Sequence, residues 1–307
     1  MSSVRAGLLL PTAGALAEQE PQRVVRLATI AEQLGFSSVW VGDHAQWHIP
    51  TLEPFSVLAA VAVSTSTVRV GTAVLLLPLR HPLHAARAAA TIDRLSGGRL
   101  TLGLGVGTDA GGDFRACGVE PSERGRIMDA ATETLVRLRA GEEVAERTAW
   151  WEVDGRLQPL PVQPCVPLRF GGRADAALRR VARHGDGWIA VFLTPERLAE
   201  RVRLLRELCE QEGRGANDVA VAVVVYVEID DDVREARERA DPHLRALYRT
   251  PAERLEAMSA FGPPSLLFDR VSQYAEAGAD EIILALASDR VEANTEAAAD
   301  LLLAPGA

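Results

Sequence analysis

The sequence has few of the features that mark secreted or membrane-bound proteins. Its three cysteines, Cys117, Cys165 and Cys209, are far apart and form no Cys-x-x-Cys pair. They therefore indicate neither a disulfide framework nor a zinc site. No stretch approaches the roughly 20 consecutive apolar residues needed to cross a bilayer, and the apolar residues 7–16 lack the charged start of a signal peptide. We therefore expect a soluble, cytoplasmic protein.

The sequence also has no excess of positively charged residues. The 307 residues include 33 Lys and Arg against 42 Asp and Glu, which gives a formal net charge of −9 at pH 7. Binding to a nucleic-acid backbone needs concentrated Lys and Arg, so nucleic acid is not an expected partner. The balance of 48% hydrophobic and 24% charged residues is ordinary for a globular protein.

Short apolar runs alternate along the chain with longer amphipathic segments. The runs expected to be strands are residues 4–10, 38–41, 68–77, 99–106, 168–170, 188–191, 219–227 and 281–286. Amphipathic segments follow them, such as 21–34, which ends at Gly35. Eight such units predict a parallel sheet closed into a (β/α)8 TIM barrel. An open doubly wound sheet is the alternative, but the sequence carries no switch-point signature for it.

The chain is longer than the roughly 250 residues that a barrel of this kind needs, so it has room for inserted loops. We expect a single domain over residues 1–307, with insertions at about 108–121, 141–167 and 231–260. The last of these should be helical, with a capping box from Thr250 to Glu253.

Glycines and reactive side chains follow several of the expected strands. Barrel active sites lie at the carboxyl ends of the strands. The residues found there are Asp43, His44 and Trp47 after the second strand, Gly105, Gly107 and Thr108 after the fourth, and Gly171, Gly172 and Arg173 after the fifth. A histidine beside an acid can move a proton. Glycines let the backbone approach a flat ring, and Gly-Gly-Arg before a helix suits a phosphate. A hydrogen-bonded loop pair and simple glycine turns remain the alternatives.

Two other motifs are set aside. Residues 105–110 match G-x-G-x-x-A, but Gly111 and Gly112 follow where a helix should open, so a Rossmann nicotinamide site is rejected. His44 and His48 have H-x-x-x-H spacing, but Pro50 follows and no H-E-x-x-H pattern is present. No metal site is therefore expected.

Six runs of the sequence are distinctive as a set. They are AEQLGFSSVWVGDH (31–44), VRVGTAVLLLPLRHP (68–82), IDRLSGGRLTLGLGVG (92–107), ERGRIMDAATETL (123–135), FGGRADAALRRVARHGDGWI (170–189) and YAEAGADEIIL (274–284). Taken in this order they resemble the luciferase-like monooxygenase superfamily, and specifically its branch that uses the deazaflavin coenzyme F420. The likeness spans nearly the whole chain.

The resemblance implies a role for each candidate site residue. It places Asp43 against the cofactor ring and His44 where a proton is moved, and it implies a non-proline cis peptide bond at Ala73–Val74 behind the ring. It also implies that Gly107 and Thr108 contact the ring or tail of the cofactor, and that Gly171 and Gly172 belong to the site of its phosphate tail. Arg173 adjoins this second pair.

Two positions depart from the F420-dependent glucose-6-phosphate dehydrogenases of this branch. Trp47 stands one position earlier than their tryptophan beside the substrate, and Ala110, next to Asp109, replaces their glutamate. A sugar-phosphate substrate is therefore disfavoured.

The expected function is that of an F420-dependent oxidoreductase that transfers a hydride between the cofactor and a small organic substrate. His44 would donate or accept the proton, tuned by Asp43 and by burial. The alternatives are an FMN-dependent monooxygenase, a non-catalytic flavin-binding protein and, in another class, a metal-dependent hydrolase. A homodimer is consistent with the resemblance.

Overall fold

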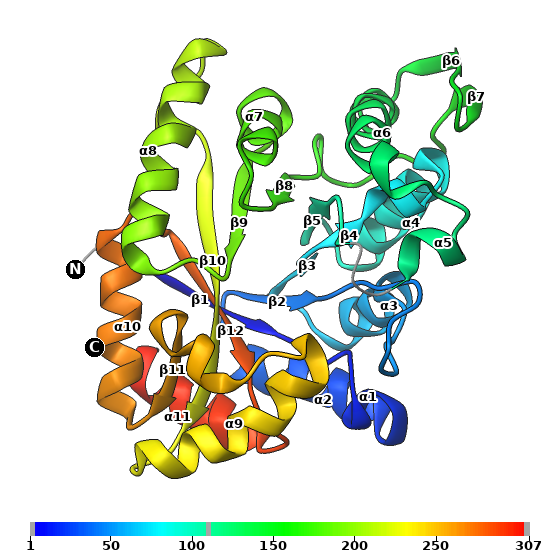
Figure 1. Cartoon of the computed structure of the whole chain (residues 1–307). Coiled ribbons are helices and arrows are strands. Elements are labelled where there is room, and N and C mark those ends of the chain that lie inside the picture. The colour runs from blue at the N-terminus through cyan, green and yellow to red at the C-terminus, as the bar shows by residue number, and fades with distance from the viewer. Residues whose placement is uncertain (1–3, 109–111, 304–307) are drawn as a thin grey trace.

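Parallel strands close into a barrel at the centre of the structure, which is a computed structural model that describes residues 4–108 and 112–303 (Figure 1). Within these residues the barrel has eight strand positions. In chain order they are β1 (Arg5–Leu9), β2 (Ser38–Val41), β3 (Arg69–Thr72) with β4 (Leu75–Leu76), β5 (Leu100–Gly105), β8 (Leu168–Gly171), β9 (Gly187–Val191), β10 (Ala220–Ile229) and β12 (Glu281–Leu286). The predicted (β/α)8 barrel is confirmed.

The strands pair in sequence order around the barrel, and the pairing of β12 with β1 closes it. β1 lies between β2 and β12, and β10 pairs with both β9 and β12. Every residue of β2, β5 and β12 is buried. Because helices cover the outside of the barrel while side chains fill its interior, strands of this kind are apolar on both faces, which explains their continuous hydrophobic runs.

The third strand position differs from its prediction. Residues 68–77 were expected to form one strand, but β3 ends at Thr72 and β4 resumes at Leu75 before a 3-10 turn, η1 (Leu77–Leu79). Between the two strands the peptide bond Ala73–Val74 is cis. The cis bond that the family resemblance implied is therefore confirmed.

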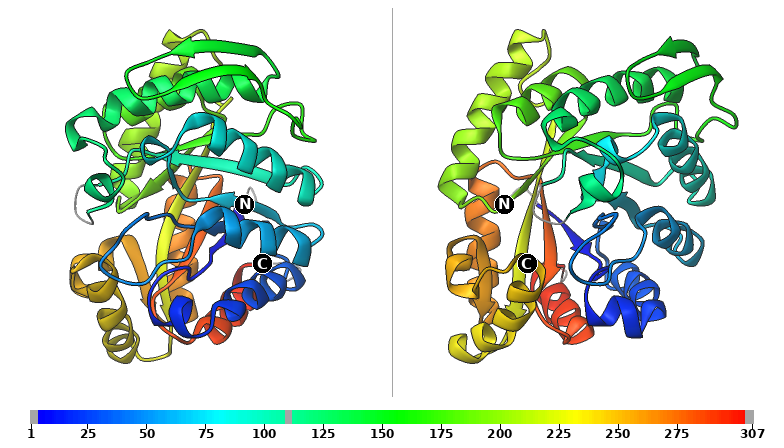
Figure 2. Two further views of the ribbon diagram at one scale, coloured as in Figure 1. Left: turned by 90° about the vertical axis from the view of Figure 1, so that its right-hand side faces the viewer. Right: turned by 45° about the vertical axis from the view of Figure 1, so that its right-hand side comes forward.

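Helices surround the barrel on its outer side (Figure 2). They are α1 (Ala15–Gln19), α2 (Pro21–Gln33), α3 (Pro54–Ser64), α4 (Pro82–Leu95), α5 (Asp113–Ala116), η2 (Pro121–Glu123), α6 (Arg124–Arg139), α7 (Asp175–His184), α8 (Pro195–Gln211), α9 (Val233–Tyr248), α10 (Pro264–Glu276) and α11 (Val291–Leu302). Several of the longer ones begin with proline, which has no N–H to lose at the first helical position. None of the described helices has the length and apolarity that a membrane span requires.

The insertion at 141–167 contains a hairpin that the sequence did not predict. β6 (Glu143–Arg147) and β7 (Glu152–Arg156) pair antiparallel and project beyond α6 (Figure 1). Trp151, in the turn between the two strands, is buried, and its indole N–H donates to Glu146 at 3.0 Å. It acts as a packing anchor.

The insertion at 231–260 is only partly helical. α9 ends at Tyr248 because Arg249 takes a left-handed conformation with φ of 53°. The capping box predicted from Thr250 to Glu253 is wrong, since the Thr250 hydroxyl donates back to the Tyr248 carbonyl.

After Thr250 only short 3-10 turns follow, η3 (Ala252–Arg254) and η4 (Glu256–Met258). The chain then forms a short strand, β11 (Ser259–Gly262), which pairs with the end of β10. β10 is long enough to offer this edge because it continues past the barrel to Ile229.

A buried ion pair lies near the amino ends of the strands, inside the barrel. Arg169 of β8 donates to Glu281, the first residue of β12, with an N···O distance of 2.6 Å. Ser38, the first residue of β2, donates to the same carboxylate, and the Arg169 guanidinium lies 5.1 Å from the ring centre of Trp40. Burial acts to raise the pKa of Glu281, but Arg169 and Ser38 together hold this pKa below its usual value.

Candidate active site

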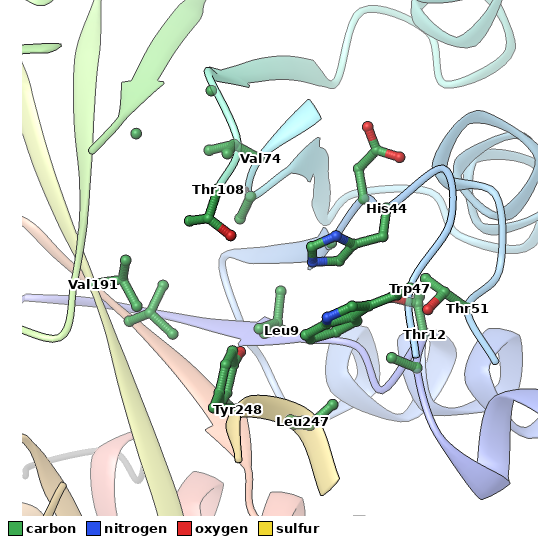
Figure 3. A pocket seen from close by; sticks show the side chains of 18 of the residues that line it. Leu9, Thr12, His44, Trp47, Thr51, Val74, Thr108, Val191, Leu247 and Tyr248 are labelled. Carbon is green, nitrogen blue, oxygen red and sulfur yellow. The ribbon is translucent and has the colours of Figure 1, made fainter. Parts of the chain in front are cut away.

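A cavity of about 440 Å³ opens at the carboxyl ends of the barrel strands (Figure 3). Its volume is within the range of small-molecule sites, which are mostly apolar with a few placed polar groups. The residues predicted from sequence that line it are Asp43, His44, Trp47, Ala73, Val74, Gly107, Thr108, Gly171 and Gly172. The barrel therefore brings together nearly all of the predicted site.

Arg173 is the exception. It is exposed and does not line the cavity, and its guanidinium lies 3.4 Å from the Phe192 carbonyl. The chain turns away after Gly172, where φ is 125°, and α7 begins only at Asp175. The prediction that Arg173 faces the same site is not supported by this geometry.

His44 is held by a carboxylate that the sequence analysis missed. Nδ1 of His44 lies 2.8 Å from Oδ2 of Asp113, which is fully buried, and the other oxygen of Asp113 accepts the Gln46 N–H at 2.8 Å. Because Asp113 occupies Nδ1, the nitrogen left to meet a bound molecule is Nε2. Residues 108–121 were expected to be loop throughout, but Asp113 begins the short helix α5.

Trp47 covers one face of the histidine ring. The indole of Trp47 stacks on His44 with ring centres 3.9 Å apart and planes 23° from parallel. On its far side Trp47 approaches Tyr248, the last residue of α9, with ring centres 6.0 Å apart (Figure 3). The indole therefore separates the His44 end of the cavity from the α9 end.

Asp43 is not the partner of His44, contrary to the expectation that it tunes the histidine. Its buried carboxylate forms a two-pronged ion pair with Arg80, with N···O distances of 2.6 and 2.8 Å, and accepts the Leu76 N–H. Burial raises the pKa of Asp43, while Arg80 and the Leu76 N–H act in the opposite direction. The pair fixes β4 and η1 beside the cavity.

The glycines that end β5 and β8 make room for a neighbouring side chain. A Cβ at Gly105 would lie 2.4 Å from Cγ2 of Val74, and one at Gly171 would lie 2.9 Å from Cγ1 of the same residue. Val74 itself faces the cavity. These glycines therefore let the Val74 side chain sit back against the barrel, rather than only bringing backbone close to a ligand.

Metal-binding arrangements are absent from the part of the chain that the structure describes, where no three His, Cys, Asp or Glu side chains are grouped to share an ion. His48 is instead turned to α9, with Nε2 2.7 Å from the Ala246 carbonyl. Asp109 and Ala110, which the sequence analysis compared with a family glutamate, lie outside the described residues.

Sequence reasoning also missed the aromatic and histidine side chains from the later barrel units. Tyr226 of β10, Phe192 after β9, and His243 and Tyr248 of α9 all line the cavity. The signal for Tyr226 was weak, since it is one polar-tipped residue within a long apolar run.

The chain belongs to the luciferase-like monooxygenase family, because residues 4–281 match the sequence profile of that family. The F420-dependent glucose-6-phosphate dehydrogenase of Beutenbergia cavernae is 34% identical over 238 residues, which cover 73% of this chain and 69% of that protein. The 4-hydroxyprotoasukamycin monooxygenase of Streptomyces nodosus is 36% identical over 170 residues, half of this chain and 46% of that enzyme.

The fold is shared with solved structures of low sequence identity. An F420-dependent secondary alcohol dehydrogenase, solved in complex with an F420–acetone adduct, superposes with a TM-score of 0.85 at 19% identity, covering 97% of this chain and 98% of that one. At this identity the likeness establishes the barrel architecture and not the reaction. The relatives thus include both F420-dependent oxidoreductases and monooxygenases.

Proposed function

We propose that the protein is an F420-dependent oxidoreductase that transfers a hydride between the cofactor and a small organic substrate. The observation that carries this proposal is the His44–Asp113 pair, which presents one imidazole nitrogen to an otherwise mostly apolar cavity. Hydride transfer to or from an alcohol or ketone also moves a proton on the substrate oxygen, so it needs a group of this kind.

The residues present fit a planar tricyclic cofactor. Ala73 and Val74 form a small, apolar wall of the cavity, and Gly107, Thr108, Gly171 and Gly172 line it from neighbouring strand ends without bulky side chains. Ala73 and Val74 would face the ring, and the others would contact its edge or tail. When bound, the deazaflavin would supply the carbon that accepts or releases the hydride.

The remaining chemistry belongs to the protein. Nε2 of His44 would take the proton from a substrate hydroxyl, or return it to a carbonyl oxygen, while Asp113 keeps Nδ1 engaged and the ring in one orientation. Trp47 and the apolar lining would exclude water and hold the substrate oxygen against His44. Asp43, already paired with Arg80, would act as a fixed polar contact for the cofactor.

A second candidate is an FMN-dependent monooxygenase, which the similarity to 4-hydroxyprotoasukamycin monooxygenase favours. Titrating the purified protein with F420 and with FMN, and measuring cofactor fluorescence, separates the two proposals. Our proposal would be supported by tight binding of F420, followed by loss of its absorbance when secondary alcohols are added under anaerobic conditions. Binding of FMN alone, with oxygen-dependent turnover, would overturn it.

The control for the proton role is His44→Gln in the same two assays. This variant should bind F420 as the wild type does and should lose hydride transfer by about 10²–10⁴-fold, the usual contribution of a positioned acid or base. Normal hydride transfer by His44→Gln would show that the proton takes another route.

A further inference from the structure

A second polar group, a pair of tyrosine hydroxyls, lies at the α9 end of the cavity, separate from His44. Tyr226 of β10 and Tyr248 of α9 hydrogen-bond through their hydroxyl groups, and their rings meet edge to face with centres 5.7 Å apart. Phe192 packs against both, parallel to Tyr226 at 5.8 Å and perpendicular to Tyr248 at 5.0 Å. The three rings form an aromatic wall that Trp47 continues toward His44.

The tyrosine pair has one hydrogen-bond donor to spare. Two hydroxyls carry two O–H donors, and the bond between them uses one. Among the described residues neither hydroxyl has another hydrogen-bond partner. Burial raises the pKa of both tyrosines, that of Tyr226 well above its ordinary value, so both hydroxyls keep their protons at neutral pH. The spare hydroxyl can therefore donate a hydrogen bond to an oxygen atom of a ligand.

The charged groups around the cavity are paired, exposed to solvent or uncharged at neutral pH. The guanidinium of Arg80 is committed to Asp43, and Arg249, a cation on the lining, is exposed. Burial lowers the pKa of His243 more than Glu228 and Asp289 raise it, so this imidazole is uncharged. A charged group brought into the apolar part of this space would lose its hydration without gaining a buried partner.

We propose that the substrate is an uncharged, largely apolar molecule with two oxygen functions. One is the reacting hydroxyl or carbonyl at His44, and the other accepts a hydrogen bond from the Tyr226–Tyr248 pair across the Trp47 ring. A ring that spans the two oxygens would pack against the aromatic wall. The identity of the reacting end rests on the proposed function, whereas the tyrosine subsite rests on the cavity alone.

The test uses three probes that share a benzene ring. 4-Hydroxyacetophenone has two uncharged oxygen functions, acetophenone lacks the second, and 4-hydroxybenzoate replaces the acetyl group with a carboxylate. Isothermal titration at neutral pH, on the protein with and without F420, measures binding independently of turnover. The wild type should bind 4-hydroxyacetophenone about threefold to tenfold more tightly than acetophenone, the worth of one hydrogen bond. It should bind 4-hydroxybenzoate more weakly than 4-hydroxyacetophenone.

The decisive variant replaces both tyrosines with phenylalanine. A single Tyr226→Phe or Tyr248→Phe leaves one hydroxyl that can still donate, whereas the double variant removes both donors and keeps the aromatic wall. It should bind the two ketones equally. Tyr274→Phe is the matched control, because the Tyr274 hydroxyl donates to the Leu193 carbonyl and does not line the cavity. This control should keep the wild-type preference.

Three results would overturn the inference. They are equal binding of the two ketones by the wild type, a preference that survives in the double variant, and binding of 4-hydroxybenzoate as tight as that of 4-hydroxyacetophenone. Failure of F420 to bind would overturn the proposed function instead. In that case the ketone preference, measured on the protein without F420, would still decide the tyrosine subsite.

Discussion

The buried carboxylate of Asp113 lies 2.8 Å from Nδ1 of His44, although 69 positions separate the two residues in the chain. One comes from the loop after β2 and the other from the short helix that follows β5, and β3 with β4 lies between these strands in the barrel. The barrel therefore assembles a histidine–carboxylate pair from two segments that carry no joint signal in the sequence.

The first prediction concerns this pair. Asp113→Asn should slow hydride transfer by about tenfold to a hundredfold, part of what a positioned acid or base contributes, because the amide supports a charged imidazole poorly. The asparagine oxygen can still accept the Gln46 N–H, so F420 affinity should not change. Single-turnover kinetics across pH would measure the effect. An unaltered rate and pH profile in Asp113→Asn would show that Asp113 only holds the loop.

The second prediction concerns Val74 and the glycine beneath it. In Gly105→Ala the new methyl group would collide with Val74, whose side chain would be pushed toward the cavity. We expect weaker F420 binding and a loss of about 1–3 kcal/mol in the free energy of unfolding, as is usual for overpacking. Adding Val74→Ala to Gly105→Ala should restore much of the F420 affinity and much of the lost free energy of unfolding. If the double variant binds F420 no better than Gly105→Ala, Val74 does not transmit the effect.

The third prediction concerns the ion pair between Asp43 and Arg80. Arg80→Met would leave the Asp43 carboxylate buried without its cation, which should lower the free energy of unfolding by about 3–5 kcal/mol. Combining Arg80→Met with Asp43→Asn removes the stranded charge and should recover part of this loss. Urea denaturation of the wild type and these two variants provides the measurement. A double variant less stable than Arg80→Met would contradict this account.

The fourth prediction concerns stability in acid. The pKa of Glu281 is lower in the folded protein than in the unfolded chain, so its contribution is present above the unfolded value of about 4.3 and is lost as pH falls through the folded value. Stability should therefore fall as pH drops from about 5 to 3.

In Glu281→Gln this acid dependence should be shallower. The variant should also be less stable at neutral pH, since Arg169 then lacks its partner inside the barrel. Urea denaturation at a series of pH values would show both effects. An acid slope in Glu281→Gln as steep as that of the wild type would assign the loss of stability to other carboxylates.

Local patterns were enough to predict the barrel and most of its rim. Continuous apolar runs mark strands that are buried on both faces, and parallel strands place the residues that follow them at one end of the barrel. Asp43, His44 and Thr108 could therefore be assigned to one cavity from their positions in the sequence. The family resemblance, rather than any pattern, supplied the cis bond at Ala73–Val74.

The short elements could not be predicted in the same way. The hairpin of β6 and β7 is five residues per strand and largely exposed, so it has little hydrophobic alternation to mark it. The strand β11 is four residues long and depends on the free edge of β10. Neither has a periodic pattern long enough to distinguish it from loop.

The sequence by itself determined the fold class, the end of the barrel that holds the cavity and the glycines that keep it open, because these depend on periodicity and on the order of elements. Only the tertiary structure decided which groups meet there. In the folded structure His44 bonds to Asp113, and Asp43 forms an ion pair with Arg80. Arg173 lies outside the cavity, and Tyr226 hydrogen-bonds to Tyr248. Side-chain partnerships across a barrel depend on how strands and helices pack around the closed ring, and no local pattern records that packing.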